Sequence, residues 1–296
     1  MTVAFDADPL QAVARQRDAG LSVSSKRRLL ARRKLPCMDM GLEGSVVIVT
    51  GASTGIGRAI ALAFAREKAR VAVTYHKDLA GAERTAELVR DAGGEPFVAR
   101  FALEEVATAA ALVDAVHARW GALHTLVNNA VYWPSGFLTV EESTLEAWCA
   151  PVHANIDGTF ALIHAALPRL RATAASAWAR IVTISTGLVV DGFPGSSAYM
   201  TGKAALHGLH RTLAKELGPA GILTNVLMSG AVEVQSRQRP AAMIERMKRS
   251  SVTGRLTEAD EVARTAVFLG SRANGHVTGE ALRCDGFFVS GVRREL

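Results

Sequence analysis

The feature that most constrains the fold of this chain is a short apolar run that ends in a cluster of glycines. Ser45–Thr50 (SVVIVT) is rich in β-branched residues and predicts a buried strand. Gly51, Gly55 and Gly57 follow it, and a helical spacing of apolar residues begins at once and continues to Lys68. Glycines permit a positive φ and bring backbone N–H groups close to an anion at a helix N-terminus. The segment therefore predicts a strand–turn–helix unit that binds the pyrophosphate of a dinucleotide.

Strand-like and helix-like segments alternate along the rest of the chain. The predicted strands are Ser45–Thr50, Arg70–Tyr75, Pro96–Phe101, Leu123–Val127, Ala179–Ser185, Leu223–Leu227 and Glu280–Cys284. The predicted helices cover Gly57–Lys68, Ala82–Ala92, Val106–Arg119, a long segment ending near Ala174, Ala198–Leu217 and Ala259–Leu269. Parallel strands need crossover helices, which cover both faces of the sheet. The pattern predicts an α/β fold, a Rossmann-like doubly wound parallel sheet of about seven strands, in a single domain over residues 38–296.

Composition narrows the class of protein. The chain has 296 residues, of which 49% are hydrophobic and 21% charged, and this excludes an intrinsically disordered protein. No apolar run approaches the roughly 18 residues of a transmembrane helix, so no membrane association is expected. The three cysteines are far apart and lack the spacing of a disulfide framework or a zinc site. Such cysteine usage is typical of a reducing compartment, and we expect a cytoplasmic protein.

The net charge of +6 is concentrated at the N-terminus. Residues 1–37 hold eight basic and three acidic side chains, so they carry +5 and the remainder is nearly neutral. We interpret residues 1–37 as a basic, flexible extension, with a nucleic-acid-binding or membrane-surface arm as the alternative. No apolar stretch follows the basic residues as in a secretory signal, and the acidic residues argue against a mitochondrial presequence. A further alternative is that Met38 or Met40 begins the functional protein.

Several motifs, in order, resemble those of the short-chain dehydrogenase/reductase family, and among its members the 3-oxoacyl-carrier-protein-reductase-like ones. The resemblance covers about residues 42–290. It rests on the T-G-x-x-x-G-x-G turn at 50–57, Asn128-Asn129-Ala130, Asn155, the Y-x-x-x-K pair Tyr199 and Lys203, Ser229-Gly230 and Asp285-Gly286. Val131 and Ser229 depart from the family pattern, in which glycine and proline are usual. The family implies an NAD(P)-dependent oxidoreductase that acts on C=O or CH–OH groups and forms homo-oligomers.

The resemblance implies a catalytic set of Tyr199, Lys203, Asn155 and a hydroxyl residue. Tyr199 and Lys203 are four residues apart, so they share one face of a helix. Tyrosine has an unperturbed pKa near 10, and a neighbouring ammonium favours the phenolate and lowers that pKa. Tyr199 is thus expected to give a proton to a carbonyl oxygen and to take it back in the reverse reaction. Lys203 would also hold the nicotinamide ribose, and Asn155 would anchor a water that relays protons to Lys203.

The hydroxyl residue is where the sequence departs from the family. The family places a serine thirteen residues before the tyrosine, and Thr186 occupies that position here. Threonine still supplies a hydroxyl, although its methyl group narrows the space beside the reacting carbon. We therefore expect activity with a restricted substrate range. Ser185 is the alternative hydroxyl, and it faces the opposite side if the strand continues.

The end of the second strand decides which nucleotide is expected. An acid there would bind the ribose 2′-OH of NAD, but the sequence reads Tyr75-His76-Lys77. Two basic residues would instead meet a 2′-phosphate, so NADP is expected, with NAD as the alternative. Phe101 and Val234 replace polar residues that usually contact the cofactor. The expected cofactor residues are Gly51, Ser53, Thr54, Gly55, Ile56, Gly57, Tyr75, His76, Lys77, Asn129, Ala130, Tyr199, Lys203 and Gly230.

The remaining candidate residues are assigned to substrate contacts or to structure. Aromatic and thioether side chains in two segments suggest a small apolar carbonyl or alcohol substrate, with an acyl thioester among the candidates; they are Tyr132, Trp133, Phe137, Met243 and Met247. Trp148 is in the same region, but it lies in a predicted helix and is interpreted as a core or interface residue. His207 and His210 lack a third ligand nearby, so we expect surface or interface histidines and no metal site. Glu104 and Glu105 are interpreted as an acidic pair at a helix N-terminus.

The sequence therefore predicts an NADP-preferring oxidoreductase that transfers a hydride to or from a carbonyl carbon. The alternative is a non-catalytic nucleotide sensor or scaffold protein, suggested by Val131, Thr186, Ser229 and Val234. The presence of Tyr199, Lys203 and Asn155 favours the enzyme. No nucleic-acid partner is expected.

Overall fold

A computed structural model of the chain describes residues 39–134, 136–232 and 240–287. The basic segment and Val234 lie outside these ranges, so the expectations about them stay predictions. The described residues from Met40 onward belong to one compact unit.

The core of that unit is a seven-stranded sheet in the order β3-β2-β1-β4-β5-β6-β7, in which every neighbouring pair is parallel. The strands are β1 Val46–Val49, β2 Arg70–Tyr75, β3 Glu95–Arg100, β4 Thr125–Asn128, β5 Ala179–Thr186, β6 Ile222–Ser229 and β7 Ala281–Cys284. The central strands β1 and β5 are buried along their whole length because helices cover both of their faces. The predicted fold class is confirmed.

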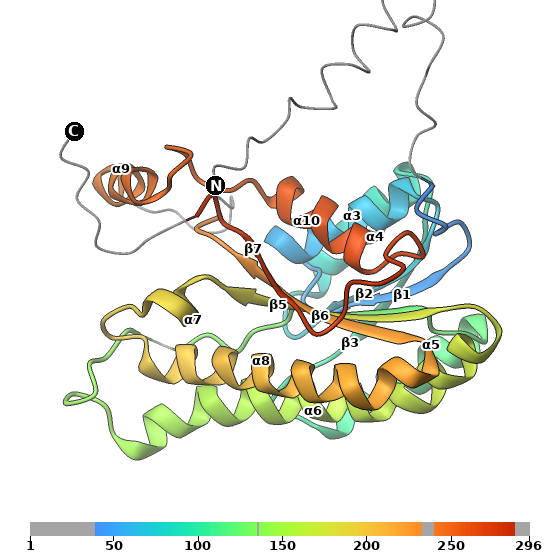
Figure 1. Cartoon of the computed structure of the whole chain (residues 1–296), viewed down its shortest axis with the longest axis horizontal. Coiled ribbons are helices and arrows are strands. Elements are labelled where there is room, and N and C mark those ends of the chain that lie inside the picture. Colours follow the sequence, from blue (N-terminus) through green and yellow to red (C-terminus); the bar gives the residue numbers. More distant parts are fainter. Residues whose placement is uncertain (1–38, 135, 233–239, 288–296) are drawn as a thin grey trace, which may run out of the picture. The chain divides into compact units, whose positions relative to one another are not determined.

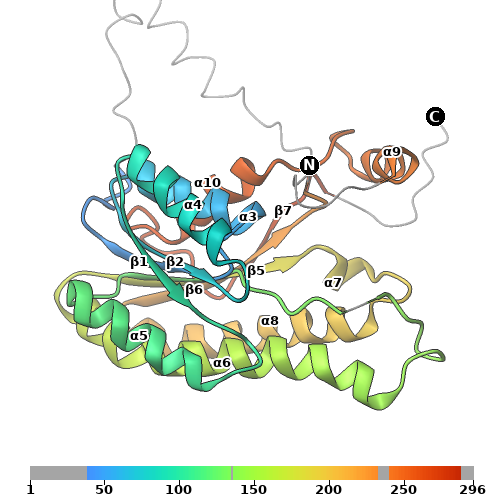
Figure 2. The same ribbon diagram turned by 180° about the vertical axis from the view of Figure 1, so that it is seen from behind.

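Six helices cover the two faces of the sheet (Figures 1 and 2). On one face lie α3 Gly55–Arg66, α4 Leu79–Asp91 and α10 Ala259–Leu269; on the other lie α5 Ala107–Trp120, α6 Leu145–Ser176 and α8 Ser197–Leu217. Each layer has its own apolar core, with Phe64 of α3 buried in the first and Leu162 of α6 in the second. These are the helices that the apolar periodicity predicts.

Three short elements were not predicted from the sequence. They are α7 Leu188–Asp191, the 3₁₀ turn η1 Gly218–Ala220 and α9 Ala241–Ser250. α7 has 4 residues and α9 has 10, so both are shorter than the helices that the sequence predicts, and neither has a buried residue. Both lie beyond the carboxyl ends of the strands, on the same side of the molecule in both views (Figures 1 and 2).

The strand order reverses between β1 and β4. Chain crossovers run outward in opposite directions from this point, which leaves a crevice at the carboxyl ends of the two strands. The glycine turn after β1 and the Asn-Asn-Ala segment after β4 meet there.

Candidate active site

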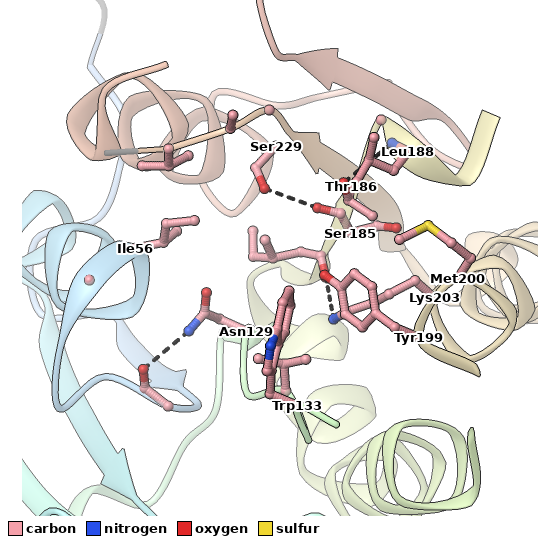
Figure 3. A pocket seen from close by; sticks show the side chains of 18 of the residues that line it. Ile56, Asn129, Trp133, Ser185, Thr186, Leu188, Tyr199, Met200, Lys203 and Ser229 are labelled. Carbon is pink, nitrogen blue, oxygen red and sulfur yellow. Dashed lines mark hydrogen bonds between the residues drawn. The ribbon is translucent and has the colours of Figure 1, made fainter. Parts of the chain in front are cut away.

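A cavity of about 1890 Å³ opens at the carboxyl ends of the strands. It reaches from the turn after β1 to the residues that follow β6, and side chains of α3, β5 and α8 lie around it (Figure 3). All but two of the predicted site residues line this cavity; the exceptions are Tyr75 and Asn155. The structure therefore brings together residues that are up to 179 positions apart in the chain, from Gly51 to Gly230.

The glycine turn has the conformation that its sequence predicts. Gly51 and Gly55 have φ values of +61° and +56°, which favour glycine. A Cβ atom on Gly57 would lie only 2.2 Å from the Gly51 carbonyl oxygen, so a larger residue does not fit there. Thr74 Oγ1 on β2 accepts a hydrogen bond from the Gly51 N–H at 3.1 Å. The turn is held so that the N-terminus of α3 faces the cavity.

Asn129 connects the two sides of the crevice. Its Nδ2 donates to the carbonyl oxygens of Thr50 at 2.9 Å and Gly51 at 3.2 Å. Thr50 Oγ1 in turn accepts from the backbone N–H groups of Asn129 and Ala130, at 2.8 and 2.9 Å. The predicted cofactor residues after β4 thus fix the position of the glycine turn as well as lining the cavity.

Tyr199 and Lys203 lie one turn apart on α8, and both are buried, with 9% and 4% of their surface exposed. The Nζ of Lys203 donates a hydrogen bond to the Ile184 carbonyl oxygen at 2.9 Å (Figure 3). Burial lowers the pKa of Lys203 to about 8. Because this value lies above neutrality, the ammonium form still predominates at pH 7. The Tyr199 ring packs against the Trp133 indole, with 4.6 Å between ring centroids.

Ser185 and Thr186, the last two residues of β5, use their hydroxyl groups differently. Ser185 Oγ lies 2.8 Å from Nε2 of His207 on α8, and this hydrogen bond is buried. Thr186 Oγ1 accepts from the Leu188 N–H at 3.3 Å. Since that bond uses a lone pair only, the Thr186 O–H proton can be donated to a ligand in the cavity.

Asn155 is buried on α6 and does not line the cavity. Its Oδ1 accepts from the Tyr132 N–H at 3.0 Å, and its Nδ2 donates to the carbonyl oxygens of Tyr132 and Pro151 at 2.9 and 2.7 Å. The amide thus anchors the segment after β4 to α6. Both Nδ2 protons are used in these bonds, so a water held by this residue, as the family resemblance implies, would have to donate to Oδ1 or to the backbone carbonyl oxygen.

The β2 side of the cavity carries mixed charges. His76 and Lys77 both line it, whereas Tyr75 lies just outside. Nε2 of His76 lies 3.0 Å from the Glu104 carboxylate, which also lines the cavity. The interpretation of Glu104 as one of a pair of helix-terminal acids was wrong, because α5 begins only at Ala107 and Glu104 turns back toward β2.

The β5–β7 side of the cavity has an apolar wall. Trp133 and Phe137 pack edge to face, with 5.7 Å between centroids, and Phe137 packs against Phe193 at 6.0 Å. Phe193 was missed from the sequence because it follows α7, a helix of 4 residues that is too short to show a helical period. From α9, Met243 and Met247 line the cavity as expected, and Arg246 and Arg249 line it beside them.

The expectation that His207 and His210 lie at the surface or at an interface was wrong. Both are buried, and His210 is only 1% exposed. The two ring nitrogens of His210 face Thr224 Oγ1 and Thr183 Oγ1, the latter at 2.6 Å. Burial lowers the pKa of His210 to about 3, so the ring is neutral at pH 7. Hydrogen bonds to hydroxyl groups of β5 and β6 make these histidines part of the core between α8 and the sheet.

A cluster of charged residues joins β7 to α7 at the edge of the cavity. Arg283 lies 2.7 Å from Asp285 and 3.3 Å from Asp191, and both carboxylates line the cavity. Hydrogen bonding to Asp285 raises the pKa of Arg283. The link spans 92 residues between Asp191 and Arg283, which is why no local pattern indicates it.

Within the described ranges, no helix is both long and apolar enough to cross a membrane. Nor do three or more His, Cys, Asp or Glu side chains gather there in a way that would hold a metal ion.

Comparisons with known proteins agree with this geometry. A family model described as enoyl-(acyl carrier protein) reductase matches residues 51–287. D-threitol dehydrogenase from Mycolicibacterium smegmatis is 33% identical over 85% of this chain and 95% of its own length. A 3-oxoacyl-[acyl-carrier-protein] reductase from Pseudomonas aeruginosa is 31% identical over 83% of this chain and 98% of its own. The crystal structure of a dehydrogenase/reductase from Sinorhizobium meliloti 1021 superimposes with a TM-score of 0.78 at 30% identity, covering 84% of this chain and 96% of that one.

The relatives share a fold and a reaction type, but their names point to different substrates, an acyl chain on a carrier protein and a sugar alcohol. What they have in common is oxidation or reduction at a carbon–oxygen bond. The match over most of the chain, together with the glycine turn and the buried Tyr199–Lys203 pair, shows that this protein belongs to the short-chain dehydrogenase/reductase family and is an oxidoreductase acting on CH–OH or C=O groups.

Proposed function

We propose that this protein transfers a hydride between NADP(H) and a ketone or secondary alcohol, with Tyr199 as general acid and base. The observation that carries the proposal is the burial of Tyr199 and Lys203 on one face of α8, beside the same cavity that the glycine turn lines. Burial of the Lys203 ammonium costs folding free energy because the group loses most of its hydration. A catalytic role explains why the protein keeps a lysine at this buried position.

The residues present fit a dinucleotide. At Gly57 the backbone leaves no room for a Cβ atom, and the N-terminus of α3 faces the cavity, as a pyrophosphate site requires. Gly51, Ser53, Thr54, Gly55, Ile56 and Gly57 would hold the pyrophosphate, Asn129, Ala130 and Gly230 would line the nicotinamide side, and Lys203 would hold the ribose. When bound, the nicotinamide supplies or accepts the hydride.

In the proposed reduction, the Tyr199 hydroxyl gives its proton to the carbonyl oxygen while that oxygen gains negative charge. The Lys203 ammonium favours the phenolate that remains. The Thr186 O–H donates a hydrogen bond to the same oxygen and stabilises its developing charge. In the oxidation direction the same groups act in reverse, with the phenolate of Tyr199 taking the alcohol proton. Asn155 acts through its hold on the Tyr132 segment.

NADP is proposed over NAD because no acid ends β2 and because His76 and Lys77 line that side of the cavity. Asp78 lies beyond the end of β2 and caps α4, where its Oδ1 accepts a hydrogen bond from the Gly81 N–H at 2.9 Å. One observation favours NAD as the alternative: the Glu104 carboxylate lies 3.0 Å from His76 Nε2, on the side of the cavity where it would repel a 2′-phosphate. Lys77 is therefore the residue on which the preference for NADP depends.

The proposal also covers the substrate, the assembly and the location of the protein: an apolar substrate group, a homo-oligomer and the cytoplasm. The wall of Trp133, Phe137, Phe193, Met243 and Met247 favours an apolar group next to the reacting carbon. A groove of about 690 Å³ between α5, α6 and α8, with Phe160 52% exposed beside it, supports homo-oligomer formation. The cytoplasmic location and the absence of a nucleic-acid partner stay predictions.

Tyr199→Phe tests the proposal. The change removes the transferable proton and should lower kcat by at least about 10²-fold, with the Kd for NADPH unchanged within about twofold. Turnover is followed by NADPH absorbance with a panel of ketones and acyl thioesters, and nucleotide binding by fluorescence. Tyr132→Phe, which removes a hydroxyl from the same cavity, serves as the control and should retain activity. Equal turnover by the Tyr199 variant and the wild type would exclude Tyr199 from the mechanism.

A further inference from the structure

The acidic side chains that line the cavity are already paired within the protein. On the β2 side, Glu104 lies against His76, and Asp78 caps α4. On the β7 side, Asp191 and Asp285 share Arg283. In the described part of the chain, every carboxylate facing the cavity thus has a cationic or N–H partner.

Two arginines on α9 also line the cavity, and they have no such ion pair among the described residues. Met243, Arg246, Met247 and Ser250 have the i, i+3, i+4, i+7 spacing of a single helix face, and they line the cavity together with Arg249. The only acid on α9, Glu245, forms its ion pair with Lys248 at 2.8 Å. Among the described residues, no carboxylate lies within 4.0 Å of the guanidinium of Arg246 or Arg249.

The position of α9 places these arginines at the substrate side of the cavity. Just after the helix, the Val252 N–H and Ser251 Oγ donate to the Gly286 carbonyl oxygen at 3.0 and 3.2 Å, so the end of α9 is tied to the chain after β7. Both views show α9 on the side of α7, away from β2 (Figures 1 and 2). Two positive charges therefore face the half of the cavity that also holds Tyr199 and the aromatic wall.

A guanidinium binds a carboxylate or phosphate through two parallel N–H···O bonds, and two of them on one helix face select an anion over a neutral group. We propose that the substrate is an anionic oxo or hydroxy compound whose carboxylate or phosphate binds Arg246 and Arg249. Its apolar segment lies along Met243 and Met247, and its carbonyl reaches Tyr199. This inference rests on the proposed oxidoreductase function and narrows its substrate class.

The competing explanation is that the arginines bind the phosphates of the nucleotide. The pyrophosphate has its own site at the N-terminus of α3, and a 2′-phosphate would lie beside Lys77, both on the other side of the cavity. The two explanations differ in a measurable way. Arginines that bind the nucleotide would affect every substrate equally, whereas arginines that bind the substrate would affect anionic substrates alone.

The test uses pairs of substrates that share the reacting carbonyl, of which one member carries an anionic group and the other is uncharged. Acetoacetate, levulinate and 5-oxohexanoate are each compared with their ethyl esters, and these pairs test for recognition of a carboxylate. Dihydroxyacetone phosphate is compared with dihydroxyacetone, and this pair tests for recognition of a phosphate. With either the carboxylates or the phosphate, the kcat/KM of the wild type should be at least about tenfold higher for the anion than for its uncharged partner. This preference should fall with increasing salt. Arg246→Gln and Arg249→Gln should remove it by raising KM, with the Kd for NADPH unchanged. Lys248→Gln removes the same charge from the same helix, off the cavity, and should leave the preference intact.

Binding is measured beside turnover, as the shift in melting temperature of the NADPH complex on adding each compound. An anion that binds through Arg246 and Arg249 without being reduced would support the inference while contradicting the proposed reaction. Equal binding of acid and ester, or an equal effect of the arginine variants on both members of a pair, would overturn the inference even if both compounds are reduced.

Discussion

Thr186 and Ser185 show how much depends on which way one hydroxyl group points. Thr186→Ala removes the O–H that is available to the cavity, so kcat should fall by about 10- to 100-fold with little change in stability. Ser185→Ala leaves a buried His207 nitrogen without its partner, so the melting temperature should fall more than kcat. Steady-state kinetics and thermal melts on both variants check this. The reverse order of effects on kcat would assign the working hydroxyl to Ser185.

Lys77 is the second residue at which one charge should decide an outcome. The wild type should have the higher kcat/KM with NADPH, and Lys77→Glu should narrow or invert the preference, because a carboxylate repels a 2′-phosphate and accepts from a ribose hydroxyl. Arg90→Glu makes the same reversal of charge at the far end of α4 and should leave the ratio unchanged. A tenfold preference of the wild type for NADH would contradict this prediction, and Glu104 would then be the acid to test.

At the scale of elements, the position of α7 depends on the Arg283 cluster. α7 follows Thr186 directly, has no buried residue of its own, and is tied to β7 through Asp191. Arg283→Met would leave the Asp285 carboxylate, whose side chain is 1% exposed, without its cation, at a cost of about 3 kcal/mol in unfolding free energy. kcat/KM should fall as well because α7 borders the cavity.

The matched control for Arg283→Met is Arg255→Met, which breaks the ion pair with Glu261. That pair is more exposed, at 52% and 25% of the two side chains, so its loss should cost less than about 1 kcal/mol and no activity. Urea denaturation and kinetics of both variants measure the difference. If the two changes proved equally harmful, the cluster at α7 would have no special role.

At the scale of the whole molecule, the basic segment should be dispensable. A chain that begins at Met38 retains Met40 and the buried Leu42, which contact the region around Ser271 and the core, and it should fold, bind NADP and turn over substrate within about threefold of the full chain. Limited proteolysis should cut the full chain near Lys26–Lys34 first. A chain that begins at Gly44 loses Leu42 and should melt at a lower temperature. Aggregation of the Met38 chain would mean that Leu29, Leu30 or Leu35 packs in the folded protein.

Much of the fold and the centre of the site could be predicted from the sequence because their signals are local. A β-branched run followed by glycines and a helical period specifies a strand, a turn and a helix within about 25 residues, whatever lies elsewhere in the chain. The four-residue spacing of Tyr199 and Lys203 places them on one helix face in the same way.

Only the tertiary structure shows which side chains from distant parts of the chain form hydrogen bonds and ion pairs with one another. His207 and His210 look like surface residues in sequence, yet Ser185, Thr183 and Thr224 satisfy their nitrogens in the core. Glu104 meets His76 across two strands, and Asp191 meets Arg283 across 92 residues. The cationic face of α9 became visible only once the helix lay over the cavity. Burial and charge pairing depend on which segments pack together, and no local pattern of residue types contains that information.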